Sequence, residues 1–182
     1  MLLLVDGYNL LHVSGLFGSA DGPPTLERSR LALLDFLGGR LPEALRKKAT
    51  IVFDAASAPP GLPAAMQYAE MRIRFAPRKS SADELIAELI VQEADPRHLT
   101  VVSSDHAVQR AARQRGANYV DSEVWFRQLQ KAPDAGNTSD EKPQSPLAGN
   151  PFPPGYAEDE AAELRAFDDL PPSGSSPGRR KS

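Results

Sequence analysis

Residues 2–11 read LLLVDGYNLL, an apolar run that stops at an acidic residue and then resumes. Leu2–Val5 favours a short buried β-strand, and it is far too short to span a membrane or to form the core of a signal peptide. Asp6 comes directly after this run. Open parallel sheets bind their ligands just outside the carboxyl ends of the strands, so Asp6 is the first candidate site residue.

Four further β-prone runs follow along the chain, at Thr50–Phe53, Met71–Phe75, Leu99–Val102 and Asn118–Val120. Helical patterns alternate with them, over residues 25–37, 42–48, 81–94, 104–115 and 122–130. This alternation predicts βαβ units and hence an α/β protein, with a mainly parallel sheet of roughly five strands covered by helices on both faces, a three-layer α/β/α arrangement. Met71–Phe75 alternates arginine with apolar residues, which suits an edge strand.

Local signals mark the helix boundaries. Residues placed to cap a helix start are Thr25, Ser81, Ser104 and Ser122, and Ser81 has a glutamate three residues later, the spacing of a capping box. The pair Gly38-Gly39 is expected to end the first of these helices. Residues 55–63, AASAPPGLP, are expected to form a loop.

The composition changes near residue 131. Segment 131–182 holds nine of the 17 prolines and, with six basic and nine acidic side chains, the whole formal net charge of −3. It carries too few large apolar side chains to offset the entropy of folding, so we expect one domain, 1–130, and a mostly disordered acidic tail. Segment 156–170 lacks proline and glycine and favours a short helix, either solvated or docking on an unknown protein partner.

Composition also excludes several classes of function. The 182 residues include no cysteine, which rules out a disulfide scaffold, thiolate-held metals and a cysteine nucleophile. A reducing, cytoplasmic location fits this composition. The sequence lacks the glycine-rich motifs of dinucleotide and nucleoside-triphosphate sites, and it has neither a nucleophile elbow nor the Asp-x-Asp of aspartyl-phosphate enzymes.

An aspartate follows four of the five predicted strands, namely Asp6, Asp54, Asp105 and Asp121. Because parallel strands end at the same edge of a sheet, these carboxylates are expected to converge along one rim. Asp121 is equally well explained as a helix-start charge. Asp83 begins a crossover helix whose N-terminus lies at the same edge, so it is expected to approach Asp6 and Asp105.

Clustered carboxylates repel one another unless a cation shares them. Oxygen ligands without cysteine or histidine suit Mg²⁺ or Mn²⁺, ions that activate water and stabilise phosphate oxygens in phosphodiester hydrolysis. Asn9 and the hydroxyls of Ser103 and Ser104 are placed to support such a site, while Ser104 is equally suited to cap a helix. The sequence therefore predicts a carboxylate metal site.

Basic and aromatic residues near the predicted rim are candidates for contacts with nucleic acid. Arg78 and Lys79 lie in a loop just before Asp83, which suits them to hold phosphates. Tyr8 adjoins the first aspartate and is placed either to stack on a base or to pack beneath the loop. Arg110 lies on the helix after Asp105, as part of a solvated face or as a further contact.

The motifs VDGYN (5–9), ADE (82–84) and SSD (103–105), in this order and spacing, closely resemble the YacP-like NYN domain, a branch of the PIN-like nuclease superfamily. The resemblance covers about residues 1–130 and implies a PIN-like fold with metal-dependent RNA cleavage, which a studied member performs on messenger RNA at the ribosome. By this likeness Asp6, Asp83 and Asp105 hold the metal, and Asn9 and Asp54 support it. An aromatic residue and a threonine often precede the family's ADE, whereas residues 77–81 here read PRKSS.

We therefore expect an endoribonuclease that cleaves single-stranded RNA with a metal held by Asp6, Asp83 and Asp105. RNA is the expected partner, with the ribosome as the implied setting and no membrane. The alternative is a non-catalytic RNA- or ribosome-binding module, which the neutral charge of residues 1–130 allows but which unneutralised rim carboxylates would hinder. A 5′-flap DNA nuclease shares the acidic rim but usually needs more helical sequence.

Overall fold

A six-stranded sheet forms the centre of the computed structural model, which describes residues 2–16, 26–54, 64–77 and 79–132. The strands are β1 (Leu2–Asp6), β2 (Ala49–Phe53), β3 (Ala65–Tyr68), β4 (Met71–Phe75), β5 (Leu99–Val102) and β6 (Asn118–Val120). Their order is β3-β4-β2-β1-β5-β6, and every pairing is parallel except that of β3 with β4. The expected mainly parallel sheet is confirmed, with one strand more than predicted.

The additional strand, β3, changes the place of β4. Because β4 pairs with β2 on one side and with β3 on the other, the prediction that Met71–Phe75 is an edge strand is wrong. The edge is β3, which is mostly exposed and is held by backbone pairing rather than by an apolar face. Ala69 and Glu70 join the two strands at positive φ (47° and 68°), without the Asn-Gly or Asp-Gly pair that usually marks such a hairpin.

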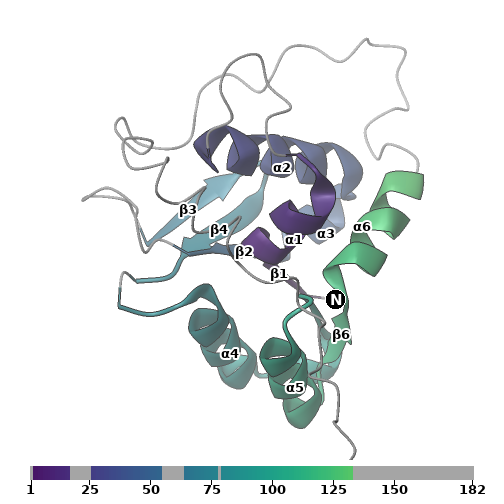
Figure 1. Cartoon of the computed structure of the whole chain (residues 1–182). Coiled ribbons are helices and arrows are strands. Elements are labelled where there is room, and N and C mark those ends of the chain that lie inside the picture. The colour runs from purple at the N-terminus through teal and green to yellow at the C-terminus, as the bar shows by residue number, and fades with distance from the viewer. Residues whose placement is uncertain (1, 17–25, 55–63, 78, 133–182) are drawn as a thin grey trace, which may run out of the picture.

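Helices cover both faces of the sheet, as Figure 1 shows. One face carries α1 (Gly7–Ser14), α2 (Leu26–Arg40) and α6 (Ser122–Lys131), and the other carries α4 (Ala82–Gln92) and α5 (His106–Arg115). Two short elements, α3 (Glu43–Arg46) and the 3-10 turn η1 (Pro96–His98), lead into β2 and β5. The three-layer α/β/α architecture is therefore confirmed.

Alternation along each inner strand supplies a core on both faces. On β1, Leu3 and Val5 pack with α1, α2 and α6, whereas Leu4 packs with α4 and α5. On β2, Phe53 and Val52 divide between the two cores in the same way. Because both faces are covered, these strands read as continuous apolar runs, which is why they could be located in the sequence.

Two helices differ from the sequence-based expectation. The sequence pattern does not predict α1, which begins directly after Asp6 and ends at Gly15 in the left-handed conformation (φ 65°). The prediction that Gly38-Gly39 ends α2 is wrong, since the helix continues to Arg40. Buried leucines on both sides of the glycines, 37 and 41, hold this turn through a 2.9 Å backbone hydrogen bond, and their burial outweighs the low helix propensity of glycine.

Aspartates rather than serines cap the last two helices. Asp105 and Asp121 each accept two backbone hydrogen bonds from the first turn, of α5 and α6 respectively. The predictions that Ser104 and Ser122 cap these helices are therefore wrong by one residue. The predicted capping box at Ser81 is present in full at the start of α4.

The cap assignment predicts a contrast between two neighbouring substitutions. Asp121→Ala should lower the free energy of unfolding by about 1 kcal/mol, because its carboxylate binds the amides of Glu123 and Val124 at 2.9 and 3.3 Å. Ser122→Ala should leave stability unchanged or raise it, because the buried Ser122 hydroxyl has no hydrogen-bond partner within the described ranges. Urea unfolding followed by Trp125 fluorescence measures both, and equal losses would contradict the assignment.

Some expectations concern residues outside the described part of the chain. These are the Thr25 cap, the loop 55–63, Arg78, and residues 133–182 with the segment 156–170. The last described helix, α6, ends at Lys131, next to the expected domain boundary. Across the described ranges, no helix has both the length and the apolar character needed to cross a lipid bilayer.

Candidate functional site

Asp6 is a buried carboxylate at the carboxyl edge of the sheet, with its side chain only 2% exposed. Its Oδ1 accepts a hydrogen bond from the Asn9 backbone nitrogen at 3.1 Å. Its Oδ2 accepts two more, from Asn9 Nδ2 at 2.6 Å and from Ser103 Oγ at 3.0 Å. Asn9 on α1 and Ser103 after β5 therefore fix both oxygens of this carboxylate.

The surroundings of Asp6 oppose its ionisation. Burial is the largest influence and raises the pKa of Asp6 above the ordinary 3.8, and the charge of Asp105 raises it further. The hydrogen bonds from Asn9 and Ser103 act in the opposite direction, because they favour the ionised form. A cation placed nearby would remove much of this cost.

Ser103 joins the end of β5 to the buried carboxylate. Besides donating to Asp6, its fully buried hydroxyl accepts a hydrogen bond from the Asp105 backbone nitrogen at 3.0 Å. Its carbonyl oxygen accepts another from Gln109 Nε2 at 2.8 Å. One residue thus connects β1, the start of α5 and the first turns of that helix.

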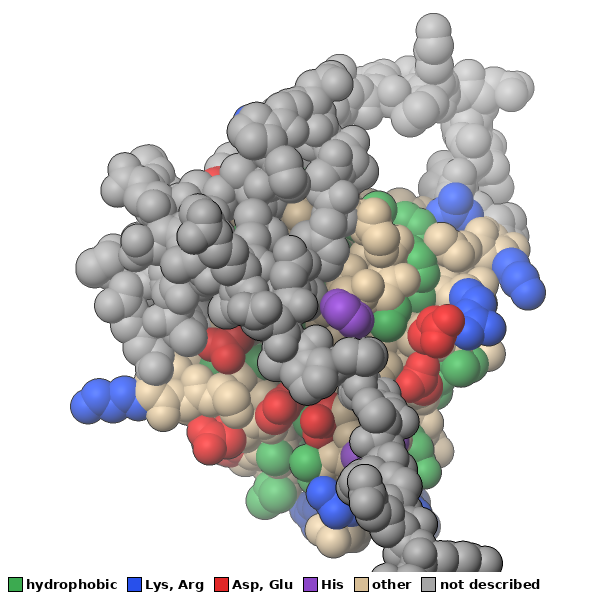
Figure 2. All heavy atoms as spheres, in the orientation of Figure 1, with side chains coloured by type: hydrophobic (Ala, Val, Ile, Leu, Met, Phe, Trp, Pro, Cys, Tyr) green, Lys and Arg blue, Asp and Glu red, His purple; other side chains and the backbone are tan. Residues whose placement is uncertain are grey.

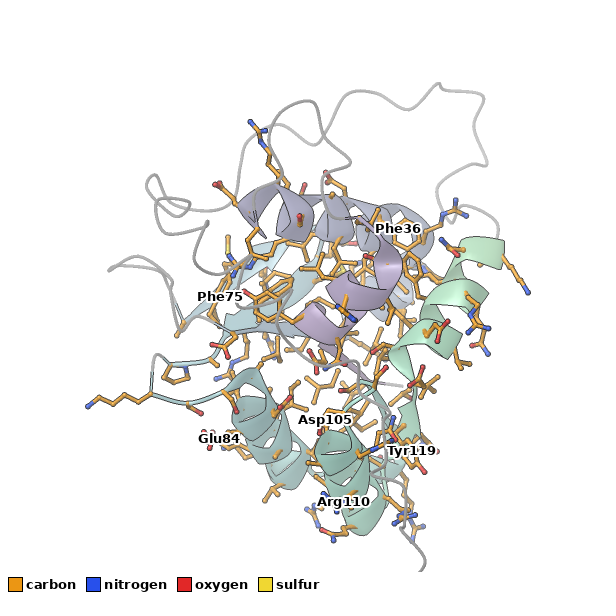
Figure 3. All side chains as sticks on the ribbon, viewed as in Figure 1. Phe36, Phe75, Glu84, Asp105, Arg110 and Tyr119 are labelled. Carbon is orange, nitrogen blue, oxygen red and sulfur yellow. The ribbon has the colours of Figure 1, made fainter. Side chains whose placement is uncertain are left out.

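Asp83 lies in the first turn of α4 and keeps an exposed side chain. The protein around it still removes part of its hydration, and repulsion from Asp6, Asp105, Asp54 and Glu84 adds to this effect, so the pKa of Asp83 rises from 3.8 to about 6. Such repulsion requires proximity, so segments distant in sequence bring their carboxylates to one rim. Figure 2 shows acidic side chains gathered near the start of α4, and Figure 3 shows Asp105 at the start of α5.

Two of the predicted site residues make different contacts. Asp121 caps α6, and its charge is not among those that raise the pKa of Asp83 or Asp6. Ser104 Oγ accepts a hydrogen bond from the Ser122 backbone nitrogen at 3.3 Å and forms none with a rim carboxylate. The group that the structure brings together therefore consists of Asp6, Asp54, Asp83 and Asp105, which we call the acidic rim.

The acidic rim fits a hard divalent cation in the kind of donors it offers, which are carboxylate oxygens supported by an amide and a hydroxyl. No three His, Cys, Asp or Glu side chains of the described residues lie close enough to share one ion directly. Water molecules or substrate phosphate oxygens would have to complete the coordination. That situation is usual for Mg²⁺, which keeps several waters and takes only one or two protein carboxylates.

Tyr8 packs against the protein beside the acidic rim. Its hydroxyl donates to the Asp54 backbone oxygen at 3.2 Å and accepts a hydrogen bond from Arg30 Nη2. Its ring meets the Phe53 ring edge-on, with the centroids 5.7 Å apart. These contacts match the packing alternative, and base stacking by Tyr8 stays a prediction.

Arg30 is a buried cation that no motif of the sequence marks as a site residue. Its side chain is 3% exposed, and its guanidinium carbon lies 5.2 Å from the centroid of the Tyr8 ring and 5.8 Å from that of Phe53. Helical spacing from the buried Leu26 and Leu33 places Arg30 on the apolar face of α2. This spacing is the feature of the sequence that could have indicated its burial.

The residues predicted to contact nucleic acid lie at the surface, as far as the structure describes them. Lys79, between β4 and α4, is exposed, and so is Arg110 on α5. Arg78 is outside the described residues. Their contact with nucleic acid stays a prediction.

The raised pKa of Asp83 predicts how stability depends on pH in the metal-free protein. In the unfolded chain Asp83 titrates near its ordinary 3.8, so between that value and about 6 the folded state holds a proton that the unfolded state has lost. Wild-type stability should therefore fall as the pH rises through 6. Asp83→Asn should abolish this loss and raise the free energy of unfolding at pH 8 by at most about 1 kcal/mol, since the exposed group is screened by solvent.

Denaturant unfolding in EDTA at pH 4 and pH 8 checks this expectation. The stabilisation by Asp83→Asn should be present at pH 8 and absent at pH 4. A stabilisation of the same size at both pH values would show that the carboxylate charge is not its cause.

Three comparisons with known proteins bear on the identity of the chain. A family model described as the YacP-like NYN domain matches residues 3–165, so the match extends past residue 130. Two crystal structures of Rae1 (YacP) from Bacillus subtilis, one of them of a point mutant, are similar, each with a TM-score of 0.50. Identity is 22% to the mutant and 23% to the other structure, and each match covers 71% of this chain and 74% of the other. At 22–23% identity, the similarity to these two structures is evidence for the fold alone. No curated protein matches the chain.

Proposed function

Because the chain belongs to the YacP-like NYN domain family, we propose that it is a metal-dependent endoribonuclease that cleaves single-stranded RNA. The observation that carries the proposal is the convergence of the acidic rim, where partial loss of hydration and then repulsion from Asp6, Asp105 and Asp54 raise the pKa of Asp83 to about 6. Holding these carboxylates together destabilises the metal-free protein, so their convergence points to a function that needs them. Cation binding is the function that such a cluster serves best.

Asp6, Asp83 and Asp105 would hold the ion, one or two of them directly and the rest through water molecules, with Asn9 and Asp54 in support. A bound Mg²⁺ or Mn²⁺ would supply a Lewis acid for the phosphate oxygens and lower the pKa of a water molecule. The protein's own contribution is positional. Asn9 and Ser103 lock the carboxylate of Asp6, while the backbone of α5 takes up one oxygen of Asp105 and leaves the other available.

Asp83 completes the arrangement from the first turn of α4. Because its side chain is exposed, it can meet an RNA phosphate and a hydrated ion without entry into a buried pocket. Its carboxylate is ionised above about pH 6, and ionisation is required for a ligand role. The apparent affinity of the metal-free protein for the ion is therefore expected to weaken below that pH, because protons then compete with the ion for this carboxylate.

Incubation of the full chain with a fluorescently labelled single-stranded RNA in Mg²⁺ and in Mn²⁺ tests the proposal. Internal cleavage that EDTA stops, with a duplex of the same sequence left intact, is the expected result. The absence of cleavage with either ion would overturn the assignment of a free-standing nuclease.

One observation favours a second candidate, a non-catalytic RNA-binding module. Among the residues described, no three potential ligands converge closely enough to bind an ion directly. In that case RNA would bind with the same affinity in EDTA and in Mg²⁺, and it would stay intact. The endoribonuclease predicts that divalent ions strengthen binding as well as permit cleavage.

The family resemblance extends the proposal to messenger RNA on the ribosome. Co-sedimentation of the chain with purified ribosomes, compared with naked messenger RNA in the cleavage assay, tests this extension. Cleavage of naked RNA at the same rate as translated RNA would show that the ribosome is not required.

A further inference from the structure

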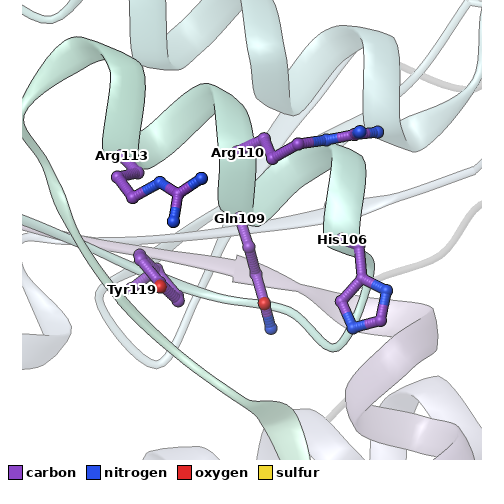
Figure 4. A pocket seen from close by; sticks show the side chains of 5 residues that line it. All are labelled: His106, Gln109, Arg110, Arg113 and Tyr119. Carbon is purple, nitrogen blue, oxygen red and sulfur yellow. The ribbon is translucent and has the colours of Figure 1, made fainter.

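A groove of about 440 Å³ lies between α5 and β6, next to the acidic rim but outside it. Its lining residues are His106, Gln109, Arg110, Arg113 and Tyr119. This volume falls within the range of sites that hold small organic ligands. Figure 4 shows that Arg113 extends toward Tyr119, while Gln109 projects between Tyr119 and His106.

We propose that this groove binds one nucleotide of a single-stranded RNA beside the cleavage site, with Tyr119 stacking on the base and Arg110 and Arg113 holding phosphates. This proposal deepens the proposed nuclease function and rests on it for the identity of the strand. It adds a second location for RNA, which neither the acidic rim nor the loop at Lys79 supplies.

Tyr119 has the exposure and the position of a stacking platform. It lies on the edge strand β6 and is 41% exposed, so its ring is accessible to a ligand. In register it pairs with Val101, whose side chain belongs to the core beneath α4 and α5, so Tyr119 lies on the face that α5 covers. An aromatic ring there can stack on any base, because every base presents a π-face.

The two arginines give the groove a positive charge. Arg110 and Arg113 are both exposed, and no salt bridge with an acidic residue is found for either within the described ranges. By contrast, Arg127 on α6 pairs with Glu123 at 2.6 Å. Guanidinium groups without a carboxylate partner are suited to phosphate oxygens, which they bind in a bidentate manner.

Gln109 adds a polar contact of fixed direction and links the groove to the acidic rim. Its Nε2 donates to the Ser103 carbonyl oxygen at 2.8 Å, which turns Oε1 away from that bond as a free acceptor for a base amino group. The same Ser103 donates its hydroxyl to Asp6 at 3.0 Å. Ser103 therefore contacts both the groove and the acidic rim, so a strand that occupies the groove would continue toward the carboxylates.

Fluorescence anisotropy with a labelled ten-nucleotide single-stranded RNA, in EDTA so that the RNA stays intact, tests the groove without using catalysis. Tyr119→Ala should weaken binding about tenfold and Tyr119→Phe by less than twofold, because phenylalanine keeps the stacking ring. Arg113→Ala should weaken binding about fivefold and reduce the slope of log affinity against log salt concentration by about 0.7. Tyr119→Ala should leave that slope unchanged.

The matched control is Arg127→Ala, which removes the same charge from α6 on the opposite face of the sheet and should change affinity by less than twofold. Three results would each overturn the proposed nucleotide site. They are an equal loss of RNA affinity in Arg127→Ala and Arg113→Ala, a wild-type affinity of Tyr119→Ala, and the absence of saturable RNA binding by the wild type. Competition by adenosine or uridine monophosphate at micromolar concentration would assign the groove to free nucleotides and overturn the assignment to a strand.

The cleavage assay separates this proposal from the nuclease itself. If the groove substitutions weaken RNA binding but the protein cleaves no RNA in Mg²⁺ or Mn²⁺, the nuclease function would be refuted and the nucleotide site in the groove would stand. If the protein cleaves RNA but substitution of Tyr119 or Arg113 leaves its RNA affinity unchanged, the nucleotide site in the groove would be refuted and the nuclease function would stand.

Discussion

Asp83→Asn is expected to lower the rate of RNA cleavage in Mg²⁺ or Mn²⁺ at least about 100-fold while the protein stays folded, because loss of a direct metal contact should exceed the effect of losing an outer partner. The exposed Asp83 carboxylate makes no hydrogen bond that holds the described part of the fold together. Asparagine removes the charge but keeps the size. A steady-state cleavage assay with circular dichroism as a folding check gives the result.

The matched control on the same helix is Glu88→Gln. Glu88 is exposed one turn further along α4, bonds only to Gln92 Nε2 among the described residues, and contributes nothing to the raised pKa of Asp83. This variant should cleave at the wild-type rate. Equal activity of Asp83→Asn and Glu88→Gln would remove Asp83 from the proposed site.

Asp6→Asn is a less clean test than Asp83→Asn. Three hydrogen-bond donors converge on the carboxylate of Asp6, two on Oδ2 and one on Oδ1. An asparagine amide can accept only through its oxygen, so its NH₂ group would face a donor from Asn9 or Ser103. If that variant lost activity, the effect of the lost charge could not be separated from the effect of a local rearrangement.

Gly7→Ala is expected to lower the free energy of unfolding by about 3 kcal/mol, at the upper end of the usual cost of overpacking. A Cβ at Gly7 would lie 2.3 Å from Phe53 Cε1 and 2.8 Å from the Val52 carbonyl oxygen. The ring of Phe53 cannot move aside easily, because Tyr8 and Phe75 pack against it at 5.7 and 6.0 Å between centroids. Urea unfolding of the two proteins measures the difference.

Gly39→Ala serves as the matched control for this substitution. Gly39 lies within α2, where a Cβ would meet nothing within 4 Å among the described residues, and alanine has the higher helix propensity. That variant should gain about 0.5–1 kcal/mol. A loss at Gly39 similar to the loss at Gly7 would mean that the steric contact with Phe53 is not the cause.

Local sequence patterns are enough to predict the layers of the fold and the edge at which the acidic residues meet. The inner strands can be located in the sequence because both of their faces are buried, which makes them continuous apolar runs. The capping box at Ser81 can be located because it depends on two residues only three positions apart. Once strands and helices alternate, the parallel direction of the strands brings Asp6, Asp54 and Asp105 to one edge, and the start of the crossover helix brings Asp83 to the same edge. These inferences need only local patterns and a general rule of chain topology.

Other features depend on partners that are distant in the chain, and they can be seen only in the folded protein. β3 exists because β4 offers it backbone hydrogen bonds, since its own side chains are mostly exposed and give no burial signal. Ser103 and Asp6 are 97 positions apart, and no local pattern encodes their hydrogen bond. The same holds for the groove, which Tyr119 of an edge strand and Arg113 of the preceding helix line together. Local free energies favour the elements, but contacts between elements select which side chains share a site.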